Sequence, residues 1–97
     1  MAGESDIEKA VCDHALERGY QVRKVKWLCR RGAPDRFFAH PFIDKPFMIE
    51  FKDTGETLRP DQKREVRALR NAGVTVYECD SVERGIRIID EALIDIQ

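Results

Sequence analysis

The sequence lacks long apolar runs, paired cysteines and clustered histidines, and each absence argues against a class of protein. No apolar segment approaches the roughly 20 residues of a membrane-spanning helix, and residues 1–17 are too acidic and polar for a signal peptide. Cys12, Cys29 and Cys79 are odd in number and widely spaced, which argues against a disulfide framework or a zinc site. We therefore expect a soluble cytoplasmic protein with reduced cysteines.

Net charge is also nearly absent, since the formal total is −1, but the charge is unevenly distributed. Residues 18–70 carry fourteen bases against seven acids, whereas residues 1–17 and residues 71–97 each have a net charge of −4. This asymmetry favours nucleic acid as a partner. A solvated basic face is the alternative. The length predicts one domain over 1–97 with a modest core, which favours oligomerisation.

Periodicity and turn residues predict seven elements in the order α-β-β-β-α-β-α. Helices are expected over 5–18, 60–72 and 82–95, and strands over 20–28, 35–39, 47–52 and 74–79. Ser5 and Glu8 have the spacing of a capping box at the start of the first helix. The second and third strands should form a hairpin, and the last β-α-β connection a right-handed crossover. The fold class is α/β, a small mixed sheet flanked by helices.

The strand over 47–52 carries the chemical signal. Its side chains alternate between two faces, so Glu50 and Lys52 lie about 7 Å apart on the face opposite the apolar residues. Those apolar residues, expected in the core, are Phe47, Ile49 and Phe51. A buried carboxylate or ammonium needs a partner or a metal. The alternative is a structural ion pair on a half-exposed strand.

Asp35 opens the preceding strand, directly after a turn through Gly32 and Pro34. If the two strands pair as a hairpin, Asp35 lies beside Glu50. Two carboxylates at one point suit Mg²⁺, and Lys52 could orient a water or stabilise charge on a phosphate. The alternative is that Asp35 is a turn residue after proline, which is common.

These motifs resemble those of the PD-(D/E)xK nuclease superfamily, with its restriction-endonuclease-like core. Gly32-Ala33-Pro34-Asp35 is followed by Glu50-Phe51-Lys52, with Glu8 on the first helix and Gln62 in the helix after the site. Over nearly all of its 97 residues the chain resembles a minimal, stand-alone VRR-Nuc (virus-type replication-repair nuclease) domain.

The resemblance implies a role for each matching residue. Asp35, Glu50 and the backbone carbonyl of Phe51 would bind the metal, and Lys52 would be the catalytic lysine. Gln62 would be a polar residue of the catalytic site. The resemblance also implies Mg²⁺, replaceable by Mn²⁺, and cleavage of DNA, above all branched DNA such as four-way junctions. It further implies a homodimer, a helicase or replication-repair partner, and a viral or bacterial origin.

Glu8 and Gln62 also have structural interpretations, which stay open. The resemblance makes Glu8 a metal ligand that completes the site, whereas the capping box would make it a helix cap worth roughly 1 kcal/mol. Gln62 could be no more than a residue in the first turn of its helix. It stands four positions before Val66, so it should face the protein interior.

Basic residues around the motif are candidates for contacts with DNA phosphates. They are Arg30, Arg31, Arg36, Arg59, Lys63 and Arg67. Each phosphate contact would add to the salt dependence of binding. Arg36, next to Asp35, is the best candidate near the cut. Trp27 and Tyr20 are expected in the core or a dimer interface rather than as platforms for stacked bases.

Three functions follow, in order of preference. The first is a metal-dependent DNA endonuclease, which is supported by the intact set of Asp35, Glu50 and Lys52. The second is a non-catalytic nucleic-acid-binding module that retains the nuclease fold. The third is a small assembly protein whose basic face meets an acidic partner.

Overall fold

The computed structural model describes residues 3–94, which form three helices and four strands in the expected order. The bounds are α1 Glu4–Glu17, β1 Gln21–Lys24, β2 Arg36–Ala39, β3 Phe47–Phe51, α2 Pro60–Asn71, β4 Thr75–Cys79 and α3 Val82–Ile94. The predicted end of the last helix at residue 95 lies outside the described residues. The α-β-β-β-α-β-α order and the α/β class are confirmed.

The strands form one mixed sheet in the order β1-β2-β3-β4. The β1/β2 and β2/β3 pairs are antiparallel, as the predicted hairpin requires, and β3 and β4 are parallel. The parallel pair is joined through α2, because parallel neighbours need a crossover connection. In this register Glu50 of β3 lies opposite Glu78 of β4.

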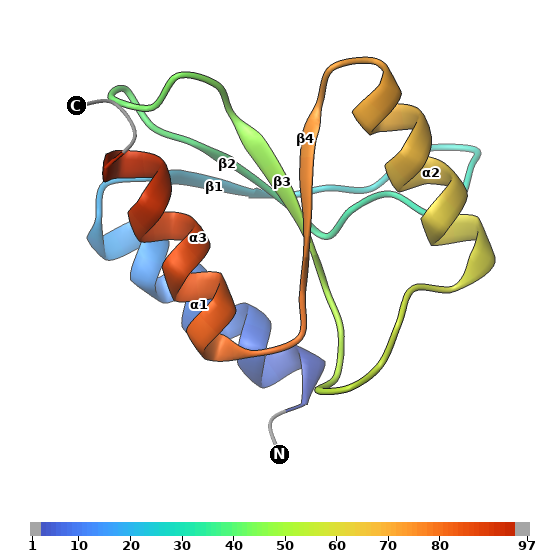
Figure 1. Cartoon of the computed structure of the whole chain (residues 1–97), viewed down its shortest axis with the longest axis horizontal. Coiled ribbons are helices and arrows are strands. Elements are labelled where there is room, and N and C mark those ends of the chain that lie inside the picture. Colours follow the sequence, from blue (N-terminus) through green and yellow to red (C-terminus); the bar gives the residue numbers. More distant parts are fainter. Residues whose placement is uncertain (1–2, 95–97) are drawn as a thin grey trace.

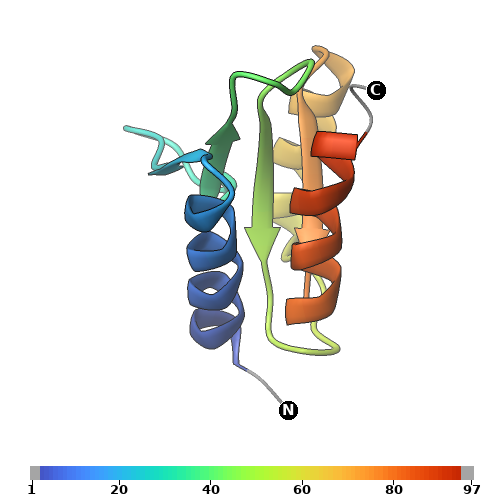
Figure 2. The same cartoon turned by 90° about the vertical axis from the view of Figure 1, so that its left-hand side faces the viewer.

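The sheet separates two layers of helices. Helices α1 and α3 pack together on one face, and α2 covers part of the other face beside β4 (Figures 1 and 2). Phe47, Ile49 and Phe51 point into the larger core under α1 and α3, as the alternation predicted. A smaller core forms under α2 around Met48 and Val66. The face that carries Glu50 is therefore the α2 face.

Close contact between α1 and α3 depends on Gly85. A Cβ atom at this position would lie 2.2 Å from Cγ2 of Val11, far inside normal contact distance. The absence of a side chain thus lets the two helices approach. Tyr20 also ties this layer together, because its hydroxyl donates to the backbone oxygen of Ile89 over 2.7 Å. Tyr20 is a core residue, as expected.

Two local predictions are wrong. The strand predicted over 20–28 ends at Lys24, and the last bond of its pairing runs from the amide of Val25 to the backbone oxygen of Asp35. The capping box of Ser5 and Glu8 is absent, because α1 begins at Glu4 with Gly3 as its N-cap and Ser5 is already helical. The Glu8 side chain is therefore available to form a contact with another residue.

The helices are short. The longest one in the described part of the chain, α1, has 14 residues, well below the length of a bilayer-spanning segment. Within residues 3–94 no helix is both long enough and apolar enough to cross a membrane.

Candidate active site

Asp35 is held where β2 and β3 begin to diverge. Its amide donates to the backbone oxygen of Ile49 over 3.1 Å, and its Oδ2 accepts from the amide of Phe51 over 2.7 Å. These two bonds fix the Asp35 carboxyl beside Glu50, where the hairpin predicted it. Burial is the main cause that raises the pKa of Asp35.

Glu50 is the most deeply buried charged group of the site, with 1% of its surface exposed. Burial first, and then the charge of Asp35, raise the pKa of the Glu50 carboxyl. Its Oε2 accepts a hydrogen bond, whereas Oε1 is buried and has no hydrogen-bond donor among the described residues. A buried carboxylate oxygen without a donor is costly unless a proton or a cation satisfies it.

Among residues 3–94, Lys52 is the only residue that forms an ion pair with Asp35 or Glu50. Its Nζ lies 4.0 Å from Oε2 of Glu50, and its side chain is 12% exposed. The backbone is fixed by a hydrogen bond from the Lys52 amide to the oxygen of Cys79 over 2.9 Å. The side chain borders a hollow of about 200 Å³ that Glu78 and Asp80 also line. Lys52 can therefore meet both Glu50 and a ligand in solvent.

Gln62 reaches Glu50 from α2. Its Nε2 donates to Oε2 of Glu50 over 2.5 Å, and its Oε1 accepts from the backbone amide of Arg59 over 3.0 Å. The side chain is buried, as its spacing from Val66 predicted. Both ends of the amide are thus used, so that Gln62 caps α2 and orients the Glu50 carboxyl at once.

Helix α1 brings two carboxylates to the site rather than one. Glu8, the predicted ligand, accepts a hydrogen bond from Nε of Arg36 over 2.6 Å and lies 4.0 Å from Nζ of Lys24. Glu4, which the sequence analysis missed, stands one turn earlier on the same face. Burial and then the charge of Asp35 raise the pKa of Glu4, while Lys52 acts in the opposite direction. The sequence signal that could have identified Glu4 is its spacing of four residues from Glu8, which places both side chains on one face of the helix.

The donor set suits a divalent cation that binds oxygen. Among residues 3–94 no group of three or more His, Cys, Asp or Glu side chains forms a complete metal cage. Mg²⁺ does not need one, because it commonly takes one or two carboxylates and completes its shell with water and substrate phosphate. Asp35 and the unpartnered Oε1 of Glu50 fit that requirement. The carbonyl of Phe51 remains a predicted third ligand.

Four of the six predicted DNA-contacting side chains are held by acidic partners. Arg36 is bound to Glu8, and the other three pairs each join an exposed arginine to a largely buried acid. They join Arg30 to Glu65 over 3.0 Å, Arg31 to Asp61 over 3.9 Å and Arg59 to Asp61 over 3.3 Å. Because these three guanidinium groups are exposed, a phosphate can compete with the acids for them. Arg36 is the least exposed of the four.

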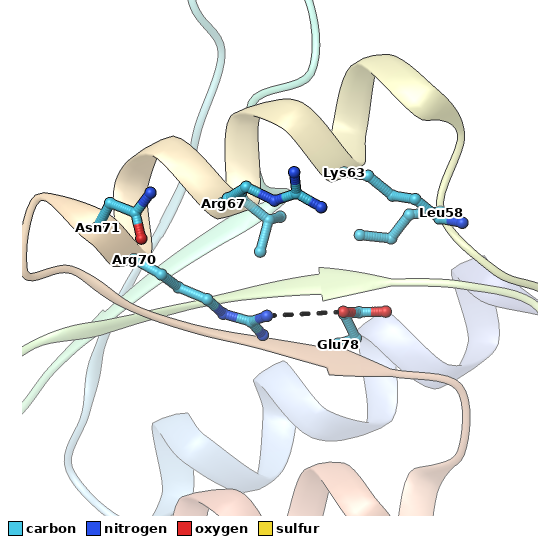
Figure 3. A pocket seen from close by; sticks show the side chains of 7 residues that line it. Leu58, Lys63, Arg67, Arg70, Asn71 and Glu78 are labelled. Carbon is cyan, nitrogen blue, oxygen red and sulfur yellow. Dashed lines mark ion pairs between the residues drawn. The ribbon is translucent and has the colours of Figure 1, made fainter.

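The other two side chains, Lys63 and Arg67, form no ion pair with a described residue and line a groove between α2 and β4. The groove measures about 300 Å³ (Figure 3). Arg70 lies in the same groove, where its guanidinium donates to the backbone oxygen of Val76 and lies 3.9 Å from Glu78. Glu78 borders both this groove and the hollow next to Lys52. The basic groove on α2 is therefore adjacent to the hollow next to Lys52, although Glu56, Glu78 and Asp80 make that hollow itself acidic.

Comparison with known proteins bears on the fold. No protein-family model and no curated protein matches the sequence. A solved structure described as "VRR_NUC domain" is 27% identical to this chain, and the match covers 90% of this chain and 94% of that one with a TM-score of 0.81. This similarity confirms the resemblance inferred from the motifs, and it identifies a nuclease-type fold.

Proposed function

We propose that this chain, a VRR-Nuc domain by its fold, is a metal-dependent endonuclease that hydrolyses backbone phosphodiesters of DNA. One observation carries the proposal: a buried pair of touching carboxyls, Asp35 and Glu50, has an unpartnered oxygen and a lysine ammonium 4.0 Å away. Two adjacent buried carboxyls destabilise a fold that binds no metal, whereas they are suitable ligands in a metal site.

Each residue of the site has its own role in this proposal. Asp35 and Glu50 bind the cation, Mg²⁺ or Mn²⁺, and the Phe51 carbonyl and a carboxylate of α1 complete its protein ligands. When bound, the ion supplies positive charge to the reacting phosphate and makes water more acidic. Lys52 donates to a phosphate oxygen or orients the attacking water. Gln62 keeps the Glu50 carboxyl in place.

Of the two glutamates on α1, Glu4 is the better candidate for contact with the ion. Glu8 already has a charged partner, since its Oε2 accepts from Arg36 over 2.6 Å. Glu4 lies close enough to Asp35 and Lys52 for both to perturb its pKa. Glu8 then positions Arg36, which stands next to Asp35 and can turn to a phosphate when DNA binds.

The distribution of charge favours DNA on the α2 side. Lys63, Arg67 and Arg70 line the groove beside β4, whereas the net negative segments at the two ends of the sequence form α1 and α3 on the other face. Phosphate contacts of this kind position DNA without reading its sequence. Selection by DNA structure, such as four-way junctions, follows more readily from this surface than selection by base sequence.

Cleavage of labelled DNA tests the proposal. Wild-type protein should cut in the presence of MgCl₂ and not in EDTA, and Glu50→Ala and Lys52→Ala should each lose the activity while still binding DNA. A panel of duplex, flap and four-way substrates tests the preference for branches. Binding without metal-dependent cleavage of any substrate would point to the non-catalytic module instead, and activity that survives both substitutions would exclude this site.

A homodimer is part of the proposal, because paired nicks in a symmetric junction need two sites related by a two-fold axis. Light scattering on a sizing column should give twice the chain mass of 11.2 kDa. A monomer at micromolar concentration that still makes paired nicks would contradict this part. A helicase or repair partner is tested by whether its addition changes the substrate preference.

A further inference from the structure

An apolar groove lies open on the α2 face of the sheet. It measures about 570 Å³, and residues of β1, β2, β3 and α2 line it. Its apolar lining comprises Val25, Trp27, Phe37, Met48, Leu69 and Val74. Trp27 is only partly buried, and its indole Nε1 has no hydrogen-bond acceptor among the described residues. The ring is therefore held by packing alone, with part of its surface free for a ligand.

The rim of this groove is basic. Arg23, Lys24 and Lys26 line it, and all three are exposed. Lys26 forms no ion pair with a described residue, whereas the ammonium of Lys24 lies 4.0 Å from Glu8 of α1, on the other side of the sheet. Within residues 3–94, no acidic side chain lines the groove. The matching ligand has a flat apolar part and attached negative charges.

We propose that this groove binds an unpaired nucleobase of the DNA substrate, stacked on Trp27, while the basic rim contacts the flanking phosphates. A nucleotide joins a flat ring to an anionic backbone, and aromatic side chains bind single strands by stacking on bases of any sequence. A base in continuous duplex is covered on both faces, so only an unstacked nucleotide can enter. This inference rests on the proposed function and specifies its substrate class.

The position of the groove places this nucleotide close to the cut. Met48, in the lining, and Glu50, in the catalytic site, are two residues apart on the same face of β3, which is about 7 Å. Val25, also in the lining, donates its amide to the backbone oxygen of Asp35 over 3.0 Å. The groove therefore selects DNA with an unpaired nucleotide next to the cleaved phosphate, as at branch points and flaps.

A second copy of the chain is the competing occupant, and the charge of the rim disfavours it. A two-fold interface brings the same patch of both chains together, so the two basic rims would lie close to one another.

Trp27 fluorescence gives a direct test, because it is the only tryptophan of the chain. The probes are an oligodeoxythymidine of about eight nucleotides and an abasic chain with the same number of phosphates, both in EDTA to prevent cleavage. The thymidine chain should quench the fluorescence and bind at least about fivefold tighter than the abasic chain. Equal quenching and equal affinity for the two probes would overturn the proposal.

Variants then assign the effect to the ring, with anisotropy of labelled probes as the readout. Trp27→Ala should weaken thymidine binding about tenfold or more and remove the difference between the probes. Trp27→Phe keeps an aromatic face and should retain most of the difference, and it serves as the test if the alanine variant does not fold. Leu28→Ala is the matched control, because Leu28 is apolar and 85% exposed but outside the groove. A preserved difference in Trp27→Ala would refute the stacking role.

The remaining outcomes distinguish a nucleobase from a second copy of the chain as the occupant of the groove. They also distinguish this inference from the proposed nuclease function. Fluorescence that changes with protein concentration without DNA, together with a dimer mass that Trp27→Ala abolishes, would show a second copy in the groove and refute the base site. A chain that cleaves junctions but treats both probes alike refutes this inference only. A chain that distinguishes the probes but never cleaves any DNA supports the base site and refutes the nuclease.

Discussion

Glu50→Gln should make the metal-free protein more stable while it removes the catalytic function. In the folded chain the pKa of Glu50 rises from 4.5 to about 8, because the carboxyl is buried and lies beside Asp35. A raised pKa means that the folded protein holds a proton that the unfolded chain releases. The stabilising contribution of Glu50 is therefore full below about pH 4.5 and is lost as the pH rises towards about 8.

The magnitude follows from this shift. One pKa unit corresponds to about 1.4 kcal/mol, so full conversion would give roughly 5 kcal/mol. Asp35 shares the titration, so only part of this free energy belongs to Glu50, and we expect about 2 kcal/mol. For a chain of this size that is on the order of 10 °C in the melting temperature.

The amide introduced by Glu50→Gln would replace the charge without loss of hydrogen bonds. The oxygen of this amide can accept from Gln62, as Oε2 of Glu50 does, and its NH₂ can donate to the Asp35 carboxylate. In EDTA near pH 8 the variant should therefore melt on the order of 10 °C above wild type, and near pH 5 the two should differ little. Excess MgCl₂ should raise the melting temperature of wild type and not that of the variant.

Thermal unfolding followed by circular dichroism, at both pH values and with and without Mg²⁺, checks this reasoning. Glu91→Gln is the matched control, because Glu91 is exposed on α3 and should leave every melting curve nearly unchanged. If Glu50→Gln melts below wild type near pH 8 in EDTA, or shows the same pH dependence, the two carboxyls are not in conflict and the argument for a metal site from their burial is refuted.

Three further predictions concern other contacts. Gln62→Ala should lower stability by about 1–2 kcal/mol in urea titrations and raise the Mg²⁺ concentration needed for cleavage, since Glu50 loses its donor. Arg67→Ala should reduce the salt dependence of duplex binding by about one unit of slope, and an unchanged slope would remove the α2 groove from the DNA path. Gly85→Ala should lower the free energy of unfolding by about 1–3 kcal/mol through its clash with Val11, and a gain in stability would show that α1 and α3 can separate without cost.

The sequence alone determined the order of elements and the central motif. Alternation in β3 and the turn before Asp35 are short-range signals, and pairing of two adjacent strands was enough to bring Asp35 to Glu50. The same local reasoning failed at Ser5, because the choice of N-cap depends on where the chain enters α1. The backbone amide of Glu4 instead donates to Oδ1 of Asp53 over 2.5 Å, and Asp53 is distant in the sequence.

Only the tertiary structure decided which charges are partnered and which surfaces are open. Three features of the site depend on segments that are far apart in the chain. Glu8 pairs with Arg36, Glu4 approaches Asp35, and Oε1 of Glu50 lacks a hydrogen-bond donor. Trp27 is the clearest case: the sequence placed it in the core or a dimer interface, and the fold packs it, partly buried, against the smaller core, where it also lines an open groove. Side-chain periodicity fixes the face of a strand, but the packing of α2 decides which part of that face stays uncovered.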